Sequence, residues 1–216
     1  MAGGKAKNTT GREERTQALR QAIVDSAIGE FAAHGYGGAS LRSIAARTGI
    51  ELGHLGYHFS TNLELWQAAV ATIFEAMPSV DAVPLPESAD EARETITRLI
   101  SEYSGFCMAR PEHVQIVFSE SAAGGERLEW LAEHHLGRIV DGLNRHVAAA
   151  HRFGVLTSVD ASIFIAALVG MSAINFGLPK LRDILLGGGL DRAAYATFIS
   201  TILSTDKGGE IPGTGN

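Results

Sequence analysis

One short stretch of the chain gathers side chains that can hydrogen-bond to phosphates and to the edges of nucleic-acid bases. His54, Tyr57 and His58 follow one another at helical spacing, and Leu52 before them could contact a thymine methyl group. Arg42 lies upstream and carries the positive charge that a phosphate contact needs. These residue types at this spacing predict a surface that binds double-stranded DNA.

Two short helices are predicted to position these side chains. They span about residues 40–47 and 51–57, with Gly49 between them. Their inward residues are apolar, namely Leu41, Ile44, Ala45, Ile50 and Leu55. The second helix is too short to be stable alone, so it needs packing partners elsewhere in the chain. The candidates are Phe31, Phe59 and Trp66. Such a pair is typical of a helix-turn-helix, whose second helix can lie in the major groove.

The same region contains a specific combination of motifs. Phe31 is followed by Gly35-Tyr36, by Ser-Leu-x-x-Ile-Ala at residues 40–45, by Gly49-Ile50 and by Gly-x-Leu-x-Tyr-His-Phe at residues 53–59. This combination resembles the DNA-binding domain of the tetracycline-repressor (TetR) family of transcriptional regulators. The resemblance implies that the DNA contacts are made by Ser40, Arg42, Glu51, Leu52, His54, Tyr57, His58, Thr61 and Asn62.

Several positions depart from the usual pattern of that family. Ala39 replaces the Thr that commonly caps the second helix, so the cap could shift to Ser40. Glu51 replaces a Ser or Thr cap, and its carboxylate suits the helix dipole and could accept a hydrogen bond from a cytosine amino group. Gly56 stands where many members carry Tyr, and Asn62 replaces a frequent Lys. These changes bear on operator sequence and affinity.

Helical spacing recurs along almost the whole chain, which predicts an all-α protein of about nine helices. The first helix should run from about Arg12 to His34 and stop at Gly35, and Thr61 with Glu64 forms a capping box for the connecting helix. The expected organisation is a disordered arm at 1–11, a helix-turn-helix domain at 12–60, a connecting helix at 61–77, a ligand-binding and dimerisation domain at 78–205 and a flexible tail at 206–216.

The C-terminal part of the chain contains a helix that is apolar nearly all round, at about 158–177, for which Ser158 is a candidate cap. The family resemblance implies a homodimer formed by this helix and a last helix at about 191–203. The alternative is that both helices fill a monomer core. A helical segment is also expected at 126–151, and Pro111 should open a short helix.

The resemblance also implies that the body binds a small effector, which would be hydrophobic or aromatic with one polar group. The candidate pocket residues are Phe74, Phe106, Phe118, Trp130, His134, Phe164, Met171 and Asn175. Their alternative role is ordinary core packing.

Charge is distributed unevenly along the chain. Its net charge is −6, but residues 1–62 contain seven basic and five acidic residues, for +2, which leaves −8 for residues 63–216. An acidic C-terminal part would avoid DNA while a mildly basic N-terminal part could approach it. Because the positive charge is small, a helical protein-binding module that has lost DNA binding is the main alternative.

Several other classes of protein are disfavoured. Cys107 is the single cysteine, so neither an internal disulfide nor a cysteine-based zinc site is possible, which fits a cytoplasmic protein. Because no nucleophile elbow, phosphate loop or dinucleotide fingerprint occurs, we expect neither an enzyme nor a cofactor. His54 and His58 have the spacing of two metal ligands, but no third ligand is evident, so no metal is expected. The uncharged run 161–179 is interpreted as a buried helix rather than a membrane span.

Overall fold

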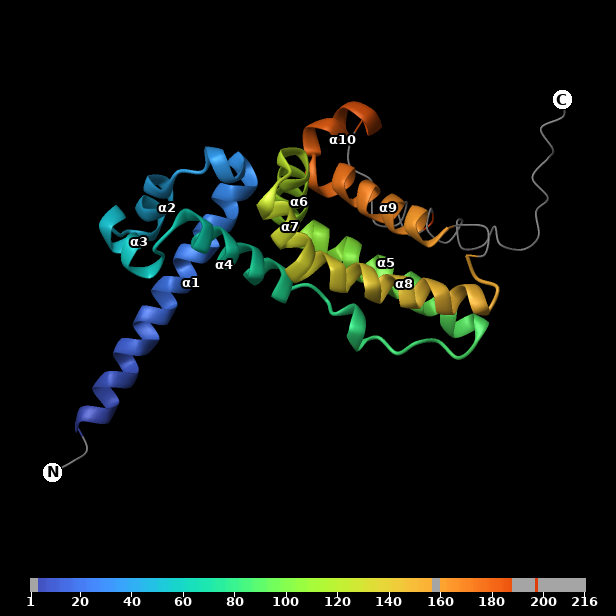
Figure 1. The fold of residues 1–216 in the computed structure, drawn as a ribbon, viewed down its shortest axis with the longest axis horizontal. Coiled ribbons are helices and arrows are strands. Elements are labelled where there is room, and N and C mark those ends of the chain that lie inside the picture. The colour runs from blue at the N-terminus through green and yellow to red at the C-terminus, as the bar shows by residue number, and fades with distance from the viewer. Residues whose placement is uncertain (1–3, 157–159, 188–196, 198–216) are drawn as a thin grey trace. The chain divides into compact units, whose positions relative to one another are not determined.

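The computed structural model describes residues 4–156, 160–187 and 197. These residues form helices and turns, and no strand occurs among them, as the sequence predicted (Figure 1). The chain divides into two compact units. The first, called the head here, comprises Met1–Ala76 and Gln115–Ala123, and the second, called the body, comprises Met77–Val114 and Gly124–Asn216.

The head begins with helix α1, Gly4–Gly38, whose backbone leaves helical geometry at Gly35 with φ 66° and ψ 176°. The positive φ favours glycine at this position, and a Cβ atom there would lie 2.8 Å from the Ser119 hydroxyl oxygen, which would have to move. The break predicted at Gly35 is therefore confirmed. The predicted start at Arg12 is wrong, because residues 4–11, expected to be a disordered arm, are helical. This segment lacks proline, and Lys5, Ala6 and Lys7 within it favour helix.

The core of the head forms between α1 and α4, Asn62–Glu75, both of which bury an apolar stripe. The buried residues are Ile23, Val24, Ala27, Ile28 and Phe31 on α1, and Leu65, Trp66, Ala69, Val70 and Ile73 on α4. The predicted capping box is confirmed, since Thr61 Oγ1 accepts a hydrogen bond from the Glu64 N–H at 3.0 Å. Glu64 in turn accepts one from the Ser60 N–H at 2.8 Å. This cap fixes where α4 begins.

The body packs α5, Ala89–Ala109, against α8, Gly137–Arg152, and α9, Ala161–Ser172. Their shared core consists of Ala92, Ile96, Ile100, Val147, Ala150, Val155, Leu156 and Leu168. A 3₁₀ turn, Val80–Ala82, is tied to α8 because Asp81 accepts hydrogen bonds from Arg138 at 2.7 Å and Arg145 at 2.5 Å. Helix α6, Pro111–Ala123, opens with Pro111 as predicted, and its residues from Gln115 onward belong to the head.

The expected helix 126–151 is interrupted in the structure. It consists of α7, Glu126–Leu131, a π-helical turn, Ala132–Leu136, and α8. A second π-helical turn, Ala173–Gly177, follows α9. Because side-chain periodicity hardly changes across one wide turn, apolar spacing alone did not reveal either interruption.

The C-terminal helices also differ from the prediction. Helix α9 is capped by Asp160, which accepts a hydrogen bond from the Ser162 N–H at 2.9 Å, whereas Ser158 lies outside the described residues. Helix α10, Pro179–Leu186, was not expected, because Gly177-Leu178-Pro179 had been interpreted as a stop. Pro179 instead occupies its first turn, where proline is favoured. The predicted helix 191–203, apart from residue 197, and the tail 206–216 lie outside the described residues.

Within the described part of the chain, no single helix has both the length and the hydropathy of a membrane span. Ala161–Gly177 and Pro179–Leu185 meet that criterion only as a pair, and the pair is bent by 99°.

Candidate nucleic-acid interface

The head contains a helix-turn-helix made of α2, Leu41–Thr48, and α3, Leu52–His58. Gly49 closes α2 in the left-handed region, with φ 71°, and its N–H bonds back to the Ala46 carbonyl at 3.2 Å. Ile44 and Ala45 of α2 and Leu55 of α3 are buried, as their spacing predicted. The turn can be this tight because glycine adopts a positive φ at little energetic cost.

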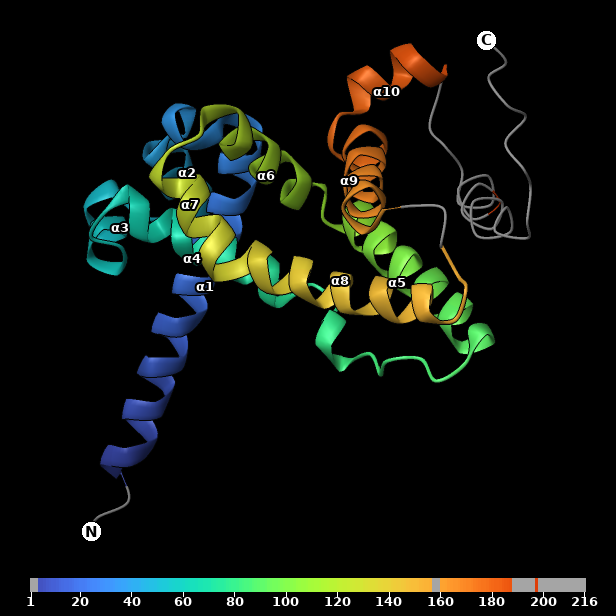
Figure 2. The same cartoon turned by 45° about the vertical axis from the view of Figure 1, so that its right-hand side comes forward.

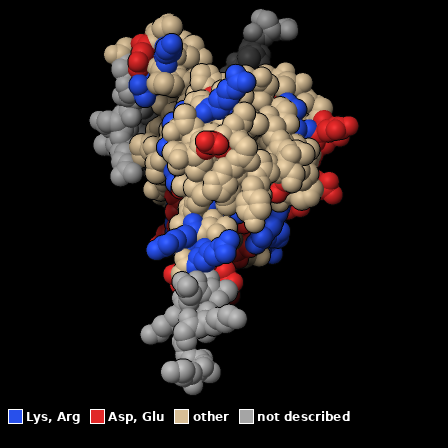
Figure 3. Space-filling view, turned by 90° about the vertical axis from the view of Figure 1, so that its left-hand side faces the viewer, with Lys and Arg blue, Asp and Glu red and all other residues tan. Residues whose placement is uncertain are grey.

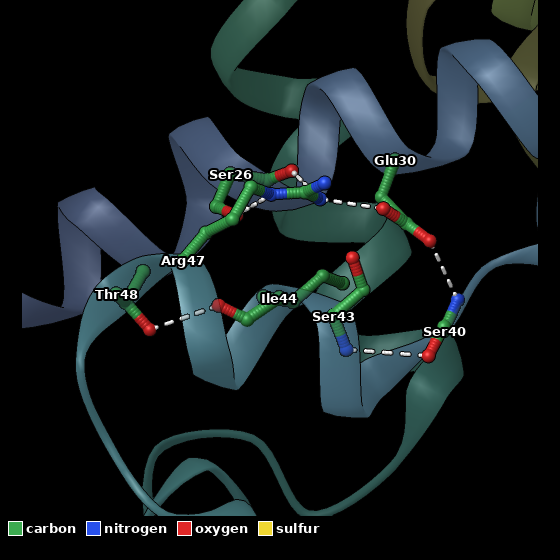
Figure 4. A network of polar contacts seen from close by, with 7 residues as sticks. All are labelled: Ser26, Glu30, Ser40, Ser43, Ile44, Arg47 and Thr48. Atoms are coloured by element: carbon green, nitrogen blue, oxygen red, sulfur yellow. Dashed lines mark hydrogen bonds and ion pairs between the residues drawn. The ribbon is translucent and has the colours of Figure 1, made fainter.

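A buried carboxylate fixes α2 against α1 (Figure 4). Glu30 of α1 is only 3% exposed, and it accepts a hydrogen bond from the Ser40 N–H at 3.0 Å. It also pairs with the Arg47 guanidinium at 2.5 Å, so one side chain binds both ends of α2. Arg47 donates further hydrogen bonds to the hydroxyl and carbonyl oxygens of Ser26, at 3.0 and 3.2 Å. Sequence patterns did not predict this network, because its members are far apart along the chain.

The network also controls the ionisation of Glu30. Burial by itself would raise the pKa of Glu30, but hydrogen bonds from the Ser40 N–H, Arg47 and Ser43 outweigh burial and lower that pKa. The carboxylate therefore stays ionised at neutral pH and keeps its attraction for Arg47. This ion pair holds α2 against α1, and α2 in turn contacts α3 through buried apolar side chains.

Helix α3 presents hydrogen-bonding side chains to solvent. Tyr57 is 82% exposed and Leu52 is 43% exposed, and His54 is exposed beside them. Glu51 is the N-cap residue, yet its exposed side chain makes no capping hydrogen bond, which leaves the carboxylate available to a ligand. This surface can donate and accept hydrogen bonds at base edges, as the residue types indicated.

His58 does not share this outward placement. It is half-buried, and its Nε2 atom is buried with no hydrogen-bond partner among the residues that the structure describes. Its ring lies 5.3 Å from that of His54 and 5.5 Å from that of Tyr57. Burial, followed by the nearby His54 and Arg20, lowers the pKa of His58. The expectation that His58 faces outward with Tyr57 is therefore wrong. His58 lies in the last turn of α3, and its contact with DNA stays a prediction.

The remaining predicted contacts flank α3. Ser40, Arg42 and Thr61 are exposed, whereas Asn62 is half-buried and its Oδ1 atom is buried. Ser40 Oγ accepts a hydrogen bond from the Ser43 N–H at 3.2 Å, which confirms that the α2 cap shifts to Ser40. Ser40 and Thr61 thus hold helix ends and can still donate their hydroxyl protons to a phosphate.

Arg20 of α1 is a further residue at this site that the sequence analysis missed. Its guanidinium carbon lies 4.5 Å from the centroid of the Phe59 ring, and Phe59 is buried at the C-terminal end of α3. A guanidinium over an aromatic face is a stabilising cation–π contact. The contact therefore places a positive charge beside the end of the candidate recognition helix.

The structure distributes the candidate pocket residues over both units. Phe74 and Phe118 belong to the head, and Phe118 is partly exposed. In the body, three groups form. Phe164 and Met171 pack against the core shared by α5, α8 and α9. Phe106 contacts the ring of His113, with centroids 5.4 Å apart, and Trp130 stacks on His134 at 4.7 Å. Asn175 donates to the Met171 carbonyl at 2.9 Å.

No group of three or more His, Cys, Asp or Glu side chains within the described ranges could hold a metal ion.

Known proteins share this sequence pattern. Residues 23–69 match the model of a family described as "Bacterial regulatory proteins, tetR family". The HTH-type transcriptional repressor SCO4008 of Streptomyces coelicolor is 27% identical over 182 residues, which cover 80% of this chain and 86% of that protein. The HTH-type transcriptional regulator SrpR of Pseudomonas putida is 37% identical over 67 residues, which cover 31% of this chain and 30% of SrpR.

Solved structures share the fold. HlyIIR, a hemolysin II transcriptional regulator, has a TM-score of 0.63 at 15% identity, covering 88% of this chain and 97% of HlyIIR. A TetR-like transcriptional regulator from Rhodococcus sp. RHA1 has a TM-score of 0.62 at 18% identity, covering 86% of this chain and 93% of that chain. The family match lies on the segment that forms the helix-turn-helix, and the likeness in fold extends over most of the chain. Residues 23–69 are therefore the DNA-binding segment of the TetR family of regulatory proteins.

Proposed function

We propose that this protein is a transcriptional repressor that binds a near-palindromic DNA operator as a homodimer in the cytoplasm. The proposal rests on one observation: one face of α3 is buried in the head and the other face is exposed. Leu55 and the adjoining Phe59 anchor it in the head, while Leu52, His54 and Tyr57 remain exposed. A short helix held in this way can enter the major groove without losing its own packing.

The exposed side chains of α3 suit direct contact with bases. Tyr57 and His54 can hydrogen-bond to base edges or phosphates, and Leu52 offers an apolar contact for a thymine methyl group. The unused carboxylate of Glu51 could accept a hydrogen bond from a cytosine amino group. The charge of residues 1–62, +2 against −8 for the rest of the chain, favours approach of this end to DNA.

An apolar face on the body supports the homodimer. Ile163 is 65% exposed on α9, and Ala166 and Ala167 on the same helix are also exposed. Small residues allow close helix contact, and a second copy would remove Ile163 from water. With two-fold symmetry, two copies of α3 would bind half-sites about 34–36 Å apart, or a multiple of that spacing.

Release from DNA would come from a small effector bound in the body. Asn175 supports an effector with a polar group, because its Oδ1 atom is buried and has no hydrogen-bond partner among the described residues. Phe106, Phe164 and Met171 supply apolar surface on neighbouring elements of the body. An effector that favours a head spacing unsuited to DNA would shift the population away from the bound state. A catalytic role forms no part of this proposal.

Replacing Tyr57 by Ala is the test of the proposed interface. We expect operator affinity to fall about 10- to 100-fold, the loss typical of a good base contact. The melting temperature and dimer mass should stay unchanged, because Tyr57 is 82% exposed. Fluorescence anisotropy with a labelled operator, thermal unfolding and light scattering measure the three quantities.

Leu55→Ala is the matched control, since removal of this buried anchor should lower both stability and affinity. Unchanged affinity in Tyr57→Ala, or a large drop in its melting temperature, would show that Tyr57 does not face DNA. The alternative, a protein-binding module, would be supported if the wild-type protein bound no genomic fragment at low salt.

A further inference from the structure

The N-terminal half of α1 lies outside the core of the head. Every side chain from Arg12 to Ala18 is exposed, and the first buried residue on the described part of α1 is Ile23. Figures 1 and 2 both show this half extending away from α2, α3 and α4, which belong to the same unit. At 1.5 Å per residue, residues 4–22 span about 28 Å. The described side chains of this half therefore do not contribute to the apolar core of the head.

Three arginines share one side of this half-helix. At 100° per residue, Arg12, Arg15 and Arg20 fall within about 140° of the helix circumference, and we call them the basic face. Glu13 borders this face beside Arg20, and Glu14 lies opposite. Neither Arg12 nor Arg15 forms an ion pair with any residue that the structure describes. Figure 3 shows Lys and Arg side chains gathered near the point where α1 leaves the head.

The basic face is continuous with the proposed DNA-reading surface. Arg20, its last member, lies over the ring of Phe59, which caps the C-terminal end of α3. Arg20 is also close enough to His58 to contribute to lowering the pKa of that residue. A duplex seated on α3 would therefore meet a positive charge at Arg20 and could meet further charges at Arg15 and Arg12 along α1.

We propose that the basic face of α1 binds backbone phosphates of the DNA that flanks the sequence read by α3. This inference rests on the DNA-binding function proposed above. A duplex carries about one negative charge per 1.7 Å of its axis, so an extended row of guanidinium groups has many phosphates within reach. Because phosphate contacts carry no base information, this face would raise affinity without altering base preference. Continuity with α3 favours DNA over an acidic protein or an anionic membrane.

The test compares the wild-type protein with Arg12→Gln/Arg15→Gln on two duplexes. One contains the selected operator with long flanks, and the other is trimmed to the two half-sites. Glutamine preserves helix propensity while removing charge. On the long duplex, the slope of log K against log salt should decrease in magnitude by about 1.8 for each α1 that contacts DNA, from two phosphate contacts at 0.9 each. On the trimmed duplex, affinity and slope should match the wild type.

Two further variants make the comparison specific. Arg93→Gln/Arg98→Gln removes the same charge from half-exposed positions on α5, where each arginine pairs with a neighbouring acid, and should leave both duplexes bound as by the wild type. Glu13→Gln/Glu14→Gln removes the acids beside and opposite the basic face, and should strengthen binding to the long duplex. Circular dichroism of each variant should show unchanged helix content.

An unchanged salt slope in Arg12→Gln/Arg15→Gln on the long duplex, with the wild type still bound, overturns the inference and leaves the proposed function intact. An equal loss on both duplexes places these arginines inside the operator and also overturns it. If the wild type binds neither duplex, the proposed function itself fails.

Discussion

Replacing Arg47 by Ala is expected to lower the free energy of unfolding of the head by about 3 kcal/mol, at the lower end of the range for breaking a buried ion pair. Glu30 is 3% exposed and remains ionised, so loss of Arg47 leaves a charged carboxylate in the protein interior. Arg47 itself is half-exposed, which is why the effect is placed at that lower end. The change in the free energy of unfolding is measured by urea unfolding, followed by the fluorescence of the buried Trp66. A Trp130→Phe background removes the other tryptophan.

Arg42→Ala is the matched control for Arg47→Ala. It removes an exposed arginine from the same helix, and surface substitutions of this kind change stability by about 0.5 kcal/mol or less. Equal, small effects of Arg42→Ala and Arg47→Ala would contradict the role of the Glu30 network.

The effect of Arg47→Ala should also depend on pH. In the wild type the folded-state pKa of Glu30 is lowered, so its ionised form stabilises the head above the unfolded-state pKa, about 4.3. That contribution is lost as pH falls through the lowered folded-state pKa. Without Arg47 the pKa of Glu30 should rise, and protonation then removes the buried charge. The difference in stability between the two proteins should therefore shrink as pH decreases toward 4.

His113 is expected to make the body sensitive to acid. Burial among aromatic rings lowers the pKa of His113 to about 4, whereas an exposed histidine titrates near 6.5. Between these two values the unfolded chain binds a proton that the folded protein does not. As pH decreases from about 6.5 to about 4, the free energy of unfolding should therefore fall by about 1.4 kcal/mol per pH unit, or about 3 kcal/mol in all.

His113→Phe isolates this contribution, because phenylalanine retains an aromatic ring and does not titrate. Denaturant unfolding of both proteins at several pH values between 7 and 4 gives the two slopes, and only their difference is used, since all other ionisable groups are common to both proteins. The wild type should lose about 3 kcal/mol more than His113→Phe over this range. Parallel slopes would mean that His113 is protonated in the folded body.

The helix-turn-helix was predictable because its signals are local. Gly35 and Gly49 were predicted as helix ends because the apolar spacing stops beside them. Both adopt a positive φ in the structure. Ile44, Ala45 and Leu55 point inward at the intervals that a helix requires. The capping box at Thr61 and Glu64 is equally local, and the structure forms it.

Features that depend on contacts between helices were not predictable from these signals. Glu30 and Arg47 meet only because α1 and α2 cross, and an acid in a surface-like helical segment gives no hint of burial. His58 has the same spacing as the exposed residues of α3, but the last turn of that helix closes against the head. Pro179 begins a helix after Gly177, although both residue types also serve as helix stops. The effector pocket and the full dimer interface stay predictions.

Selection of bound fragments from a randomised DNA pool tests the central claim most directly. The wild-type protein should enrich a near-palindromic sequence with half-sites about 34–36 Å apart, or a multiple of that distance. A variant with Leu52, His54 and Tyr57 replaced by Ala should remain folded and enrich nothing. The account would be contradicted if the wild type enriched no sequence at low salt, or if that variant enriched the same sequence as the wild type.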